Sequence, residues 1–260
     1  MIEMSTVKDL GHIFKRLAAM KRILIALDFD GTVSNIVDDP EGARMTQQAR
    51  FALTNLGGLD GLIIALISGR SLDSLARVAR PVKDWLLVGS HGVEFSWESS
   101  AGDHSSKLEI PMDLVRSFED ITAKHCGSRL EKKPFGLALH TRALGQAESK
   151  AVEDMARQVV AEWEQPLLFR VGKGVVEFST REGTKAEGIA ALKKLAKPDV
   201  TLFAGDDLTD EDGFRALSGE DIGIRVGHGS TVAEHRLPNV ESVAQMLEII
   251  YSERCKQFAL

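Results

Sequence analysis

The sequence has few of the features that mark secreted, membrane-spanning or repetitive chains. Two of its 260 residues are cysteine, Cys126 and Cys255. They are too few for a disulfide framework, so a reducing compartment fits and we expect the cytoplasm. No apolar run reaches the length of a membrane-spanning helix, and the N-terminus lacks a signal-like apolar segment. We find no internal repeat and no low-complexity stretch.

Positive charge is also scarce, because 32 Lys and Arg against 38 Asp and Glu give a formal net charge of -6. That balance argues against nucleic acid or an anionic membrane as a partner, although a local basic pocket can still bind phosphate. The composition is 43% hydrophobic and 27% charged, which is ordinary for a globular protein of one large or two small domains. We expect a monomer whose partner is a small molecule.

The most informative stretch covers residues 23–34. Its first five residues are aliphatic, which predicts a strand buried on both faces, as in parallel sheets. Asp28 and Asp30 follow directly, and Gly31 then permits a sharp turn. Two carboxylates at the end of a buried strand repel each other, and a cation between them offsets that cost. The alternative is a solvated turn, which rarely follows so apolar a strand.

Strands and helices alternate along most of the chain. Unbroken apolar runs predict further strands over residues 62–67 and 85–88, and largely apolar segments predict strands over residues 200–204 and 222–226. Helical spacing of apolar residues predicts helices over residues 5–20, 46–56, 72–78, 184–196, 209–217 and 241–251. This alternation predicts an α/β fold with a doubly wound parallel sheet, a Rossmann-like core.

A different pattern interrupts the alternation. Residues 93–97 alternate as an antiparallel strand does, with residues 107–110 as the expected return strand. Beyond them, a helix followed by two strands is predicted twice: 112–126, 129–132 and 136–140, then 147–163, 167–171 and 174–178. We therefore expect an inserted α/β cap domain over residues 111–180, with residues 1–110 and 181–260 sharing the core sheet.

A second acidic cluster follows the strand predicted over residues 200–204. It contains Asp206, Asp207, Asp210 and Glu211. A helix N-terminus rich in acids, with Thr209 as N-cap, is an alternative that accounts for Asp210 and Glu211. It does not account for Asp206 and Asp207 at the end of a buried strand, where an octahedral oxygen site for magnesium fits better. Whether Asp207, Asp210 and Glu211 support the site or cap the helix stays open.

Two groups with phosphate-binding potential lie at other element ends. Ser68, Gly69 and Arg70 follow the strand over residues 62–67, although a polar turn with Ser68 as N-cap is the alternative. Lys185 lies in the first turn of the helix predicted over residues 184–196. A lysine there opposes the helix dipole by about 0.3–1 kcal/mol. A bound phosphate would offset that, since helix N-termini attract anions.

In this order the motifs resemble those of the haloacid dehalogenase superfamily across nearly the whole core. The stretch Asp-Phe-Asp-Gly-Thr at residues 28–32 resembles the first motif, and Ser68-Gly-Arg the second. The resemblance implies a phosphatase in which Asp28 is the nucleophile and Asp30 the general acid/base. It also implies that Ser68 and Lys185 hold the phosphoryl group.

The same resemblance implies a metal site and contacts around the phosphate. The fourth motif of the superfamily looks like the stretch that begins at Gly205, and its first aspartate, a metal ligand, is Asp206 here. The implied ligands of Mg²⁺ are Asp28, Asp30 (through its backbone carbonyl) and Asp206. Gly69 and Arg70 are the expected further contacts of the substrate's phosphate.

More narrowly, the chain looks like the trehalose-6-phosphate phosphatase family. Residues 205–211, Gly-Asp-Asp-Leu-Thr-Asp-Glu, and residues 91–94, His-Gly-Val-Glu, carry the likeness in the core. Residues 131–133, 140–142 and 172–177 carry it in the cap. The sequence departs from the family pattern at Phe178-Ser179-Thr180, in place of Arg-Pro, and at Lys185-Ala186, in place of Lys-Gly.

The narrower resemblance implies a magnesium-dependent hydrolase of trehalose biosynthesis that converts trehalose 6-phosphate to trehalose and phosphate. The implied sugar-binding residues are Lys133, His140, Arg142, Lys173 and Glu177. Taken singly, Lys133, His140 and Lys173 fit a solvated or structural role better, and their joint match to one family is what favours sugar binding. The alternatives are a phosphatase for sucrose 6-phosphate or a mannosyl- or glucosyl-3-phosphoglycerate, and a non-catalytic sugar-phosphate sensor.

Overall fold

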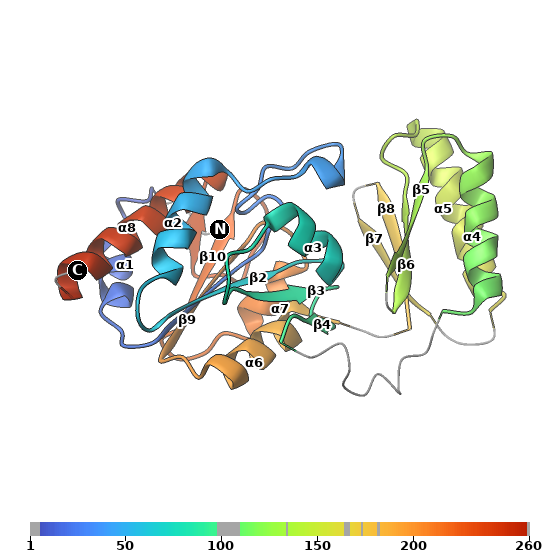
Figure 1. Cartoon of the computed structure of the whole chain (residues 1–260). Coiled ribbons are helices and arrows are strands. Elements are labelled where there is room, and N and C mark those ends of the chain that lie inside the picture. Colours follow the sequence, from blue (N-terminus) through green and yellow to red (C-terminus); the bar gives the residue numbers. More distant parts are fainter. Residues whose placement is uncertain are drawn as a thin grey trace. The chain divides into compact units, whose positions relative to one another are not determined.

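The computed structural model describes residues 6–97, 110–133, 135–163, 167–172, 174–180 and 183–258. The chain divides into two compact units, one formed by Met1–Glu98 with Gly183–Leu260 and the other by Ser99–Glu182. We call them the core unit and the insert unit (Figure 1). Each contains a sheet and helices, so the predicted α/β class is confirmed. None of the described helices combines the length and apolarity that a bilayer crossing needs.

The core unit is built on a seven-stranded sheet in the order β11-β10-β9-β1-β2-β3-β4. Its strands are β1 (Ile23–Leu27), β2 (Leu62–Ile67), β3 (Leu86–Gly89), β4 (Glu94–Phe95), β9 (Val200–Gly205), β10 (Ile222–Val226) and β11 (His235–Leu237). Neighbouring strands are parallel except β3 and β4, which are antiparallel. β1 is buried along its whole length between β9 and β2, which explains its unbroken aliphatic sequence.

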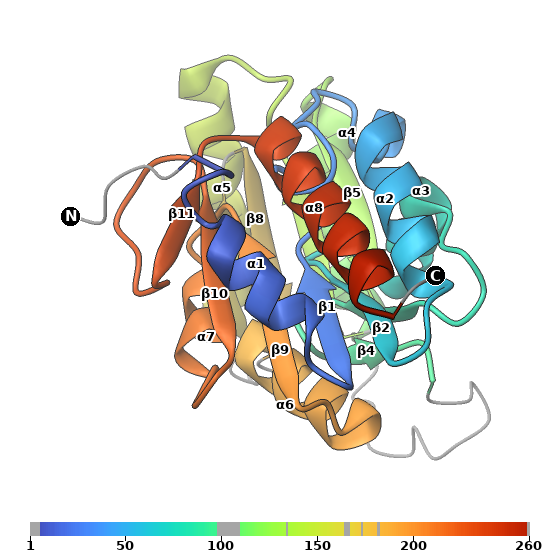
Figure 2. The ribbon, with the colours of Figure 1, turned by 90° about the vertical axis from the view of Figure 1, so that its left-hand side faces the viewer.

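Helices cover both faces of the core sheet. On one face lie α1 (Gly11–Ala18), α2 (Gln47–Gly57), α3 (Leu72–Ala79) and α8 (Val240–Phe258), and Figure 2 shows α1, α2 and α8 in front of the strands. On the other face lie α6 (Lys185–Ala196) and α7 (Asp210–Arg215). Side chains of β1 alternate between the two apolar clusters, Ile25 on one face and Leu24 on the other. This is the predicted doubly wound arrangement.

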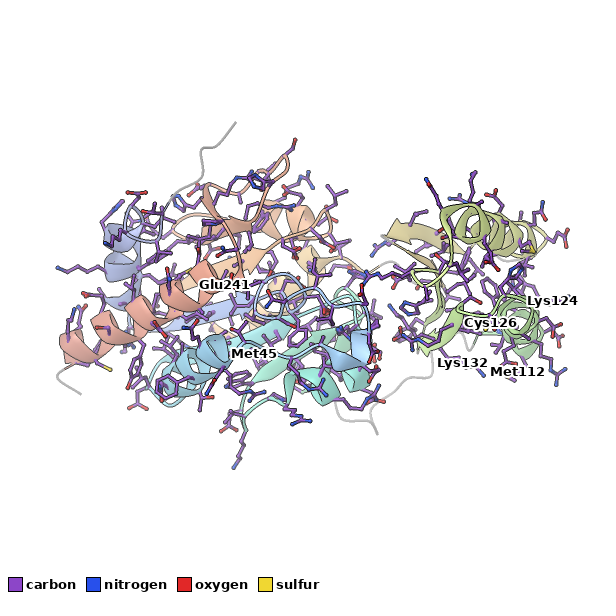
Figure 3. All side chains as sticks on the ribbon, turned by 90° about the horizontal axis from the view of Figure 1, so that it is seen from above. Met45, Met112, Lys124, Cys126, Lys132 and Glu241 are labelled. Atoms are coloured by element: carbon purple, nitrogen blue, oxygen red, sulfur yellow. The ribbon has the colours of Figure 1, made fainter. Side chains whose placement is uncertain are left out.

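The insert unit has a four-stranded antiparallel sheet in the order β5-β6-β8-β7. Its strands are β5 (Arg129–Lys133), β6 (Gly136–His140), β7 (Leu168–Gly172) and β8 (Val175–Ser179). Its helices are α4 (Met112–Lys124), whose two ends are labelled in Figure 3, and α5 (Gln146–Ala161). Phe118, Val152 and Phe178 join helices and sheet in one apolar cluster. The other face of this sheet is therefore left for polar side chains.

Three local features differ from the predictions. Ser71, not Ser68, caps α3, because its Oγ accepts a hydrogen bond from the Ser74 backbone N at 3.3 Å. β4 pairs with β3, and the predicted return strand over residues 107–110 lies outside the described residues except for Ile110, which is not in a strand. β11 was not predicted, because three residues give too little periodicity.

Arg254 ties α8 to the elements that precede β1 and β2. Its guanidinium donates hydrogen bonds to the backbone carbonyl oxygens of Ala18, Met20, Lys21 and Asp60. The residue is buried. A buried carbonyl without a donor costs about 1–3 kcal/mol, so this side chain stabilises the whole edge of the core unit.

Replacing Arg254 by Met should lower the free energy of unfolding by about 3 kcal/mol or more, because these carbonyl oxygens lose their donors. Urea denaturation at neutral pH measures the change. Arg16→Met is the matched control, since Arg16 makes only an exposed ion pair with Glu220 at 3.3 Å. It should cost less than about 1 kcal/mol. Equal losses in the two variants would contradict this role of Arg254.

Candidate active site

The parallel register brings several strand ends to one edge of the core sheet. In the pairing of β1 with β9, Leu27 lies opposite Ala204, and the Asp28 backbone N donates to the Ala204 carbonyl at 2.9 Å. β2 lies on the other side of β1 and ends just before Ser68. Asp28, Asp206 and Ser68 therefore follow neighbouring strands at the edge where open α/β sheets bind ligands.

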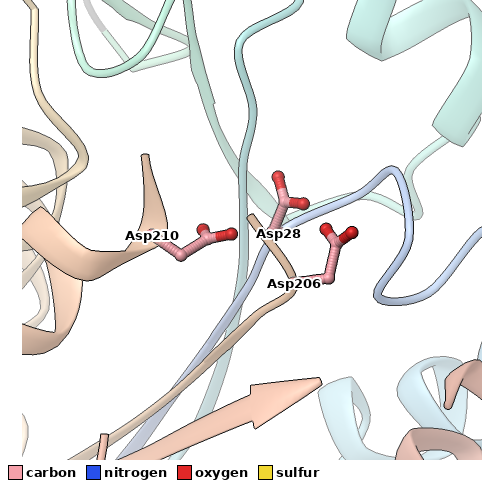
Figure 4. Close-up of side chains that lie close together, drawn as sticks. All are labelled: Asp28, Asp206 and Asp210. Atoms are coloured by element: carbon pink, nitrogen blue, oxygen red, sulfur yellow. The ribbon is translucent and has the colours of Figure 1, made fainter. Parts of the chain in front are cut away.

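Three carboxylates gather at this edge (Figure 4). Asp28, Asp206 and Asp210 each offer an oxygen atom, and these atoms lie within 4.8 Å of one another. Asp28 and Asp210 are buried, and Asp206 is half-buried. Gly31 lies against Asp206: its φ is +79°, and a Cβ atom there would meet Asp206 Oδ2 at 2.2 Å. The glycine of the first motif is thus needed for the approach of the two loops.

Lys185 is buried between two of these carboxylates. Its Nζ donates to Asp28 Oδ1 at 2.8 Å and to Asp210 Oδ1 at 2.6 Å, and its side chain is 2% exposed. The start of α6 places it, because Thr184 and Glu187 form a capping box immediately around it. The two carboxylates offset the cost of a lysine in the first turn of a helix.

Burial raises the pKa of all three carboxyl groups, because it disfavours their charged forms. For Asp28, burial lifts the pKa well above its usual range, Asp210 and Asp206 add to the rise, and Lys185 opposes it. Burial, with Asp210 and Asp207, raises the pKa of Asp206 to about 6. Burial works against the Lys185 ammonium, but the carboxylates of Asp210 and Asp28 outweigh it and raise its pKa.

A divalent cation fits this donor set. Three acidic groups around one ammonium leave an excess of negative charge in a place where water is scarce, and hard divalent cations prefer carboxylate oxygens. Of the predicted ligands, the structure brings the carboxylates of Asp28 and Asp206 together, and the predicted contact of the Asp30 backbone carbonyl stays a prediction. The structure adds Asp210, which the sequence left open. The sequence signal that could have identified Asp210 is its position, four residues after Asp206 and close to the end of the strand predicted over residues 200–204.

The carboxylate of Asp30 pairs with Arg70. Arg70 Nε donates to Asp30 Oδ2 at 2.6 Å, and Nη2 donates to Oδ1 at 2.7 Å. The backbone N of Arg70 donates to Ser68 Oγ at 3.1 Å, which fixes that buried hydroxyl. Gly69, between them, lies against the His91 ring, since a Cβ atom there would meet His91 Cε1 at 2.5 Å. The predicted substrate contacts of Gly69 and Arg70 stay predictions.

The other two acids of the second cluster make structural contacts, Asp207 within its own loop and Glu211 with residues that follow α7. Asp207 Oδ1 accepts hydrogen bonds from the backbone N of Thr209 at 2.8 Å and from its Oγ1 at 2.7 Å. Glu211 Oε2 accepts from the Val232 backbone N at 2.8 Å, and its Oε1 lies 3.4 Å from Arg225 Nη1. Thr209 makes no side-chain cap hydrogen bond to α7, so the capping alternative does not describe it.

Predicted sugar-binding residues of the insert unit take part in two side-chain pairs on the polar face of its sheet. Lys133 Nζ lies 2.5 Å from Glu177 Oε1, and His140 Nε2 lies 2.9 Å from Glu131 Oε2. Glu131 and Glu177 both lie opposite Ala138 in the strand register, so the two pairs share one face. Burial resists ionisation of Glu131, but the His140 hydrogen bond and the Lys133 charge lower its pKa. Glu131 was not singled out as a site residue from the sequence.

The two remaining predicted sugar-binding residues belong to the turn between β7 and β8 and its surroundings. Arg142 lies against this turn, because a Cβ atom on Gly174 would meet Arg142 Cα at 2.9 Å. Lys173 lies outside the described residues. Val175, at the start of β8, lies opposite His140 at the end of β6, so Gly174 and Arg142 lie at this end of the insert sheet.

This fold and this cluster of acids around a buried lysine define a phosphatase of the haloacid dehalogenase type. The family model described as trehalose-phosphatase matches residues 26–241. The chain belongs to that family of phosphoric monoester hydrolases, and the predicted resemblance is confirmed.

Individual relatives agree with the family assignment. The trehalose-6-phosphate phosphatase of Escherichia coli (strain K12) is 33% identical over 228 residues, which cover 86% of this chain and 84% of the relative. A trehalose 6-phosphate phosphatase of Zea mays is 29% identical over 262 residues, 90% and 71% of the two chains. The solved C-terminal domain of C. albicans trehalose-6-phosphate phosphatase matches with a TM-score of 0.76 at 23% identity, covering 97% and 98%. At that identity the structure supports the fold alone.

Replacing Lys185 by Met should lower the free energy of unfolding by about 3 kcal/mol, because Asp28 and Asp210 stay buried without their ammonium partner. Urea denaturation in metal-free buffer measures the loss. Lys193→Met on the same helix is the control: its Nζ lies 2.6 Å from Asp221 Oδ2, but its side chain is 30% exposed. About 1 kcal/mol is expected there. A Lys185 variant as stable as this control would show that the buried ion pairs do not stabilise the core.

Proposed function

We propose that the chain hydrolyses trehalose 6-phosphate to trehalose and phosphate, with Mg²⁺, through an aspartyl-phosphate on Asp28. The observation that carries the proposal is the buried Lys185–Asp28 pair beside Asp206 and Asp210, in a chain of the trehalose-phosphatase family. A nucleophile, a cation near the phosphoryl oxygens and a set of metal donors are the parts that this reaction needs. The name of the E. coli relative supports the choice of sugar.

In the first step, a carboxylate oxygen of Asp28 attacks phosphorus, and the bond between phosphorus and the bridging oxygen of the sugar breaks. Asp30, in its acid form, gives its proton to that oxygen, so trehalose leaves as a neutral alcohol. Lys185 and the Ser68 hydroxyl donate hydrogen bonds to the phosphoryl oxygens. When bound, Mg²⁺ would be held by Asp28, Asp206 and Asp210, with the Asp30 backbone carbonyl as a further proposed ligand, and it would supply positive charge that offsets the charge of the phosphoryl group.

In the second step, Asp30, now a carboxylate, takes a proton from a water molecule whose oxygen attacks phosphorus. The bond between Asp28 and phosphorus breaks, which releases inorganic phosphate and restores the Asp28 carboxylate. Asp30 ends the cycle protonated, as it began. One carboxyl group thus serves as acid and then as base.

Recognition of the sugar belongs to the insert unit, which we propose is the cap domain of the enzyme, over residues 111–180. The core groups described above address the phosphate and the bridging oxygen. The pairs Lys133–Glu177 and His140–Glu131 offer hydrogen-bond donors and acceptors held side by side on one face. Sugar hydroxyls both donate and accept, so such a face suits a disaccharide. Arg142 and Lys173 are further proposed contacts.

A panel of sugar phosphates tests the reaction itself. Phosphate release should be fastest, by kcat/KM, with trehalose 6-phosphate. EDTA should abolish it and added Mg²⁺ restore it, and Asp28→Asn should remove turnover without unfolding the protein. Preference for sucrose 6-phosphate or a glycosylphosphoglycerate would overturn the sugar assignment. Full activity in EDTA would overturn the metal, and no release from any ester would indicate a sensor.

The polar face of the insert sheet yields a second test. Lys133→Ala and Glu177→Ala should each lower kcat/KM for trehalose 6-phosphate by about 10²-fold or more, because the hydroxyl groups of the sugar lose hydrogen-bond partners in the protein. Hydrolysis of p-nitrophenyl phosphate should barely change. Lys132→Ala is the matched control: Lys132, labelled in Figure 3, pairs with Glu119 at 2.7 Å and is 57% exposed. If both substrates slow equally in the Lys133 and Glu177 variants, these residues serve folding.

A further inference from the structure

The proposed reaction asks for a carboxyl group at position 30 with a fixed direction. Asp30 must give a proton to one oxygen atom and later take one from a water molecule at nearly the same place. Its side chain is 36% exposed, so packing alone does not fix it. A misdirected acid or base forfeits most of its contribution to the rate, since that contribution depends on hydrogen-bond reach.

Arg70 supplies that direction through a two-pronged contact. Nε and Nη2 of its guanidinium donate to the two carboxylate oxygens of Asp30 at 2.6 and 2.7 Å. Parallel N–H···O bonds of this kind fix the plane of a carboxylate as well as its position. Because each oxygen has a second lone pair, the pairing leaves room for the proton that Asp30 carries.

The guanidinium is itself held from other sides. Its Cζ lies 5.7 Å from the centre of the Phe29 ring, and Nη1 lies 3.5 Å from Ser74 Oγ, at the limit of a hydrogen bond. Ser74 Oγ in turn lies 3.4 Å from Glu41 Oε1. The Arg70 side chain is 12% exposed. These contacts and this burial hold the Arg70 side chain in one position.

We propose that Arg70 is the positioning residue of the general acid/base Asp30. This inference rests on the proposed function, and it differs from the role expected from the sequence, in which Arg70 contacts the phosphate of the substrate. Through its backbone N, the same residue also occupies a lone pair of Ser68 Oγ, so the Ser68 hydroxyl proton can point to a phosphoryl oxygen.

The two roles of Arg70 differ in how the rate depends on the leaving group. Loss of a phosphate contact slows every phosphate ester by a similar factor. Loss of a well-directed acid slows esters of basic alcohols, which need a proton to leave, and spares esters such as p-nitrophenyl phosphate, whose phenolate leaves unprotonated. A series of aryl and alkyl phosphates therefore separates positioning from binding.

The experiment compares Arg70→Gln, Arg70→Lys and Asp30→Asn by the pre-steady-state release of the alcohol from this series. In the Arg70 variants, release from trehalose 6-phosphate should fall by about 10²- to 10⁴-fold, the usual contribution of general acid–base catalysis. The p-nitrophenolate burst should persist, and slow hydrolysis of the phosphoenzyme should follow it. Lysine keeps the positive charge but lacks the two parallel N–H donors of the guanidinium group, so the release rates of Arg70→Lys should resemble those of Arg70→Gln.

Two further measurements sharpen the outcome. Combining Arg70→Gln with Asp30→Asn should add no loss beyond Asp30→Asn alone, because both changes remove one function. Arg16→Gln, the loss of an exposed Arg–Glu pair in the same unit, should leave the leaving-group dependence unchanged. Equal slowing of all esters, or nearly full activity in Arg70→Lys, would overturn the positioning role.

Two safeguards keep the test decisive. If the Arg70 variants do not fold by circular dichroism, Ser74→Ala removes only the outer contact of the guanidinium, and it should steepen the leaving-group dependence in the same direction. An unchanged dependence in that folded variant would overturn the proposal. The aryl phosphates need no sugar recognition, so a wild-type enzyme that hydrolyses them but not trehalose 6-phosphate contradicts the substrate assignment and leaves this test intact.

Discussion

A buried ammonium between two carboxylates is the interaction on which the core unit depends. Lys185 is the first residue of α6, Asp28 follows β1 and Asp210 is the first residue of α7, and the two acids lie 157 and 25 positions from the lysine in the sequence. Neither carboxylate is stable in so buried a place without an opposite charge, and the ammonium is not stable there without them. The contact therefore forms only when the chain has returned from the insert unit, which separates β4 from α6.

Structural stability alone does not explain this group of charges, because the acids outnumber the ammonium group. One ammonium faces three carboxyl groups, and the pKa of each is raised by burial. A core selected for stability alone would replace the surplus acids with apolar residues. Their presence beside a glycine that makes room for the Asp206 carboxylate is consistent with a cation-binding site, and acids with perturbed pKa values gather at functional sites.

The sequence predicts much of the core fold and several residues of the candidate site. The contacts that it does not predict depend on how side chains are directed and on how strands are paired. A short, unbroken aliphatic run that ends in a turn favours a strand buried on both faces, so β1 and the acids after it were predictable, as was Lys185 at a helix start. Asp210 was not, because spacing does not tell whether the first turn of α7 faces the strands or solvent. The Arg70–Asp30 pair spans 40 positions and depends on side-chain directions, on which sequence periodicity gives no information. The pairing of His140 with Glu131 depends likewise on strand register.

The paired side chains of the two units differ in burial, and this difference suits the two chemistries proposed for them. In the core unit the lysine is 2% exposed and its partners are nearly as buried, so the charges act on one another strongly and suit a phosphoryl group and a cation. In the insert unit, the members of the Lys133–Glu177 and His140–Glu131 pairs are 10–23% exposed. Their charges are closer to balanced and partly hydrated, so they offer oriented donors and acceptors rather than a strong field. Such a face binds an uncharged polyol better than an anion, which supports the division of labour proposed between the two units.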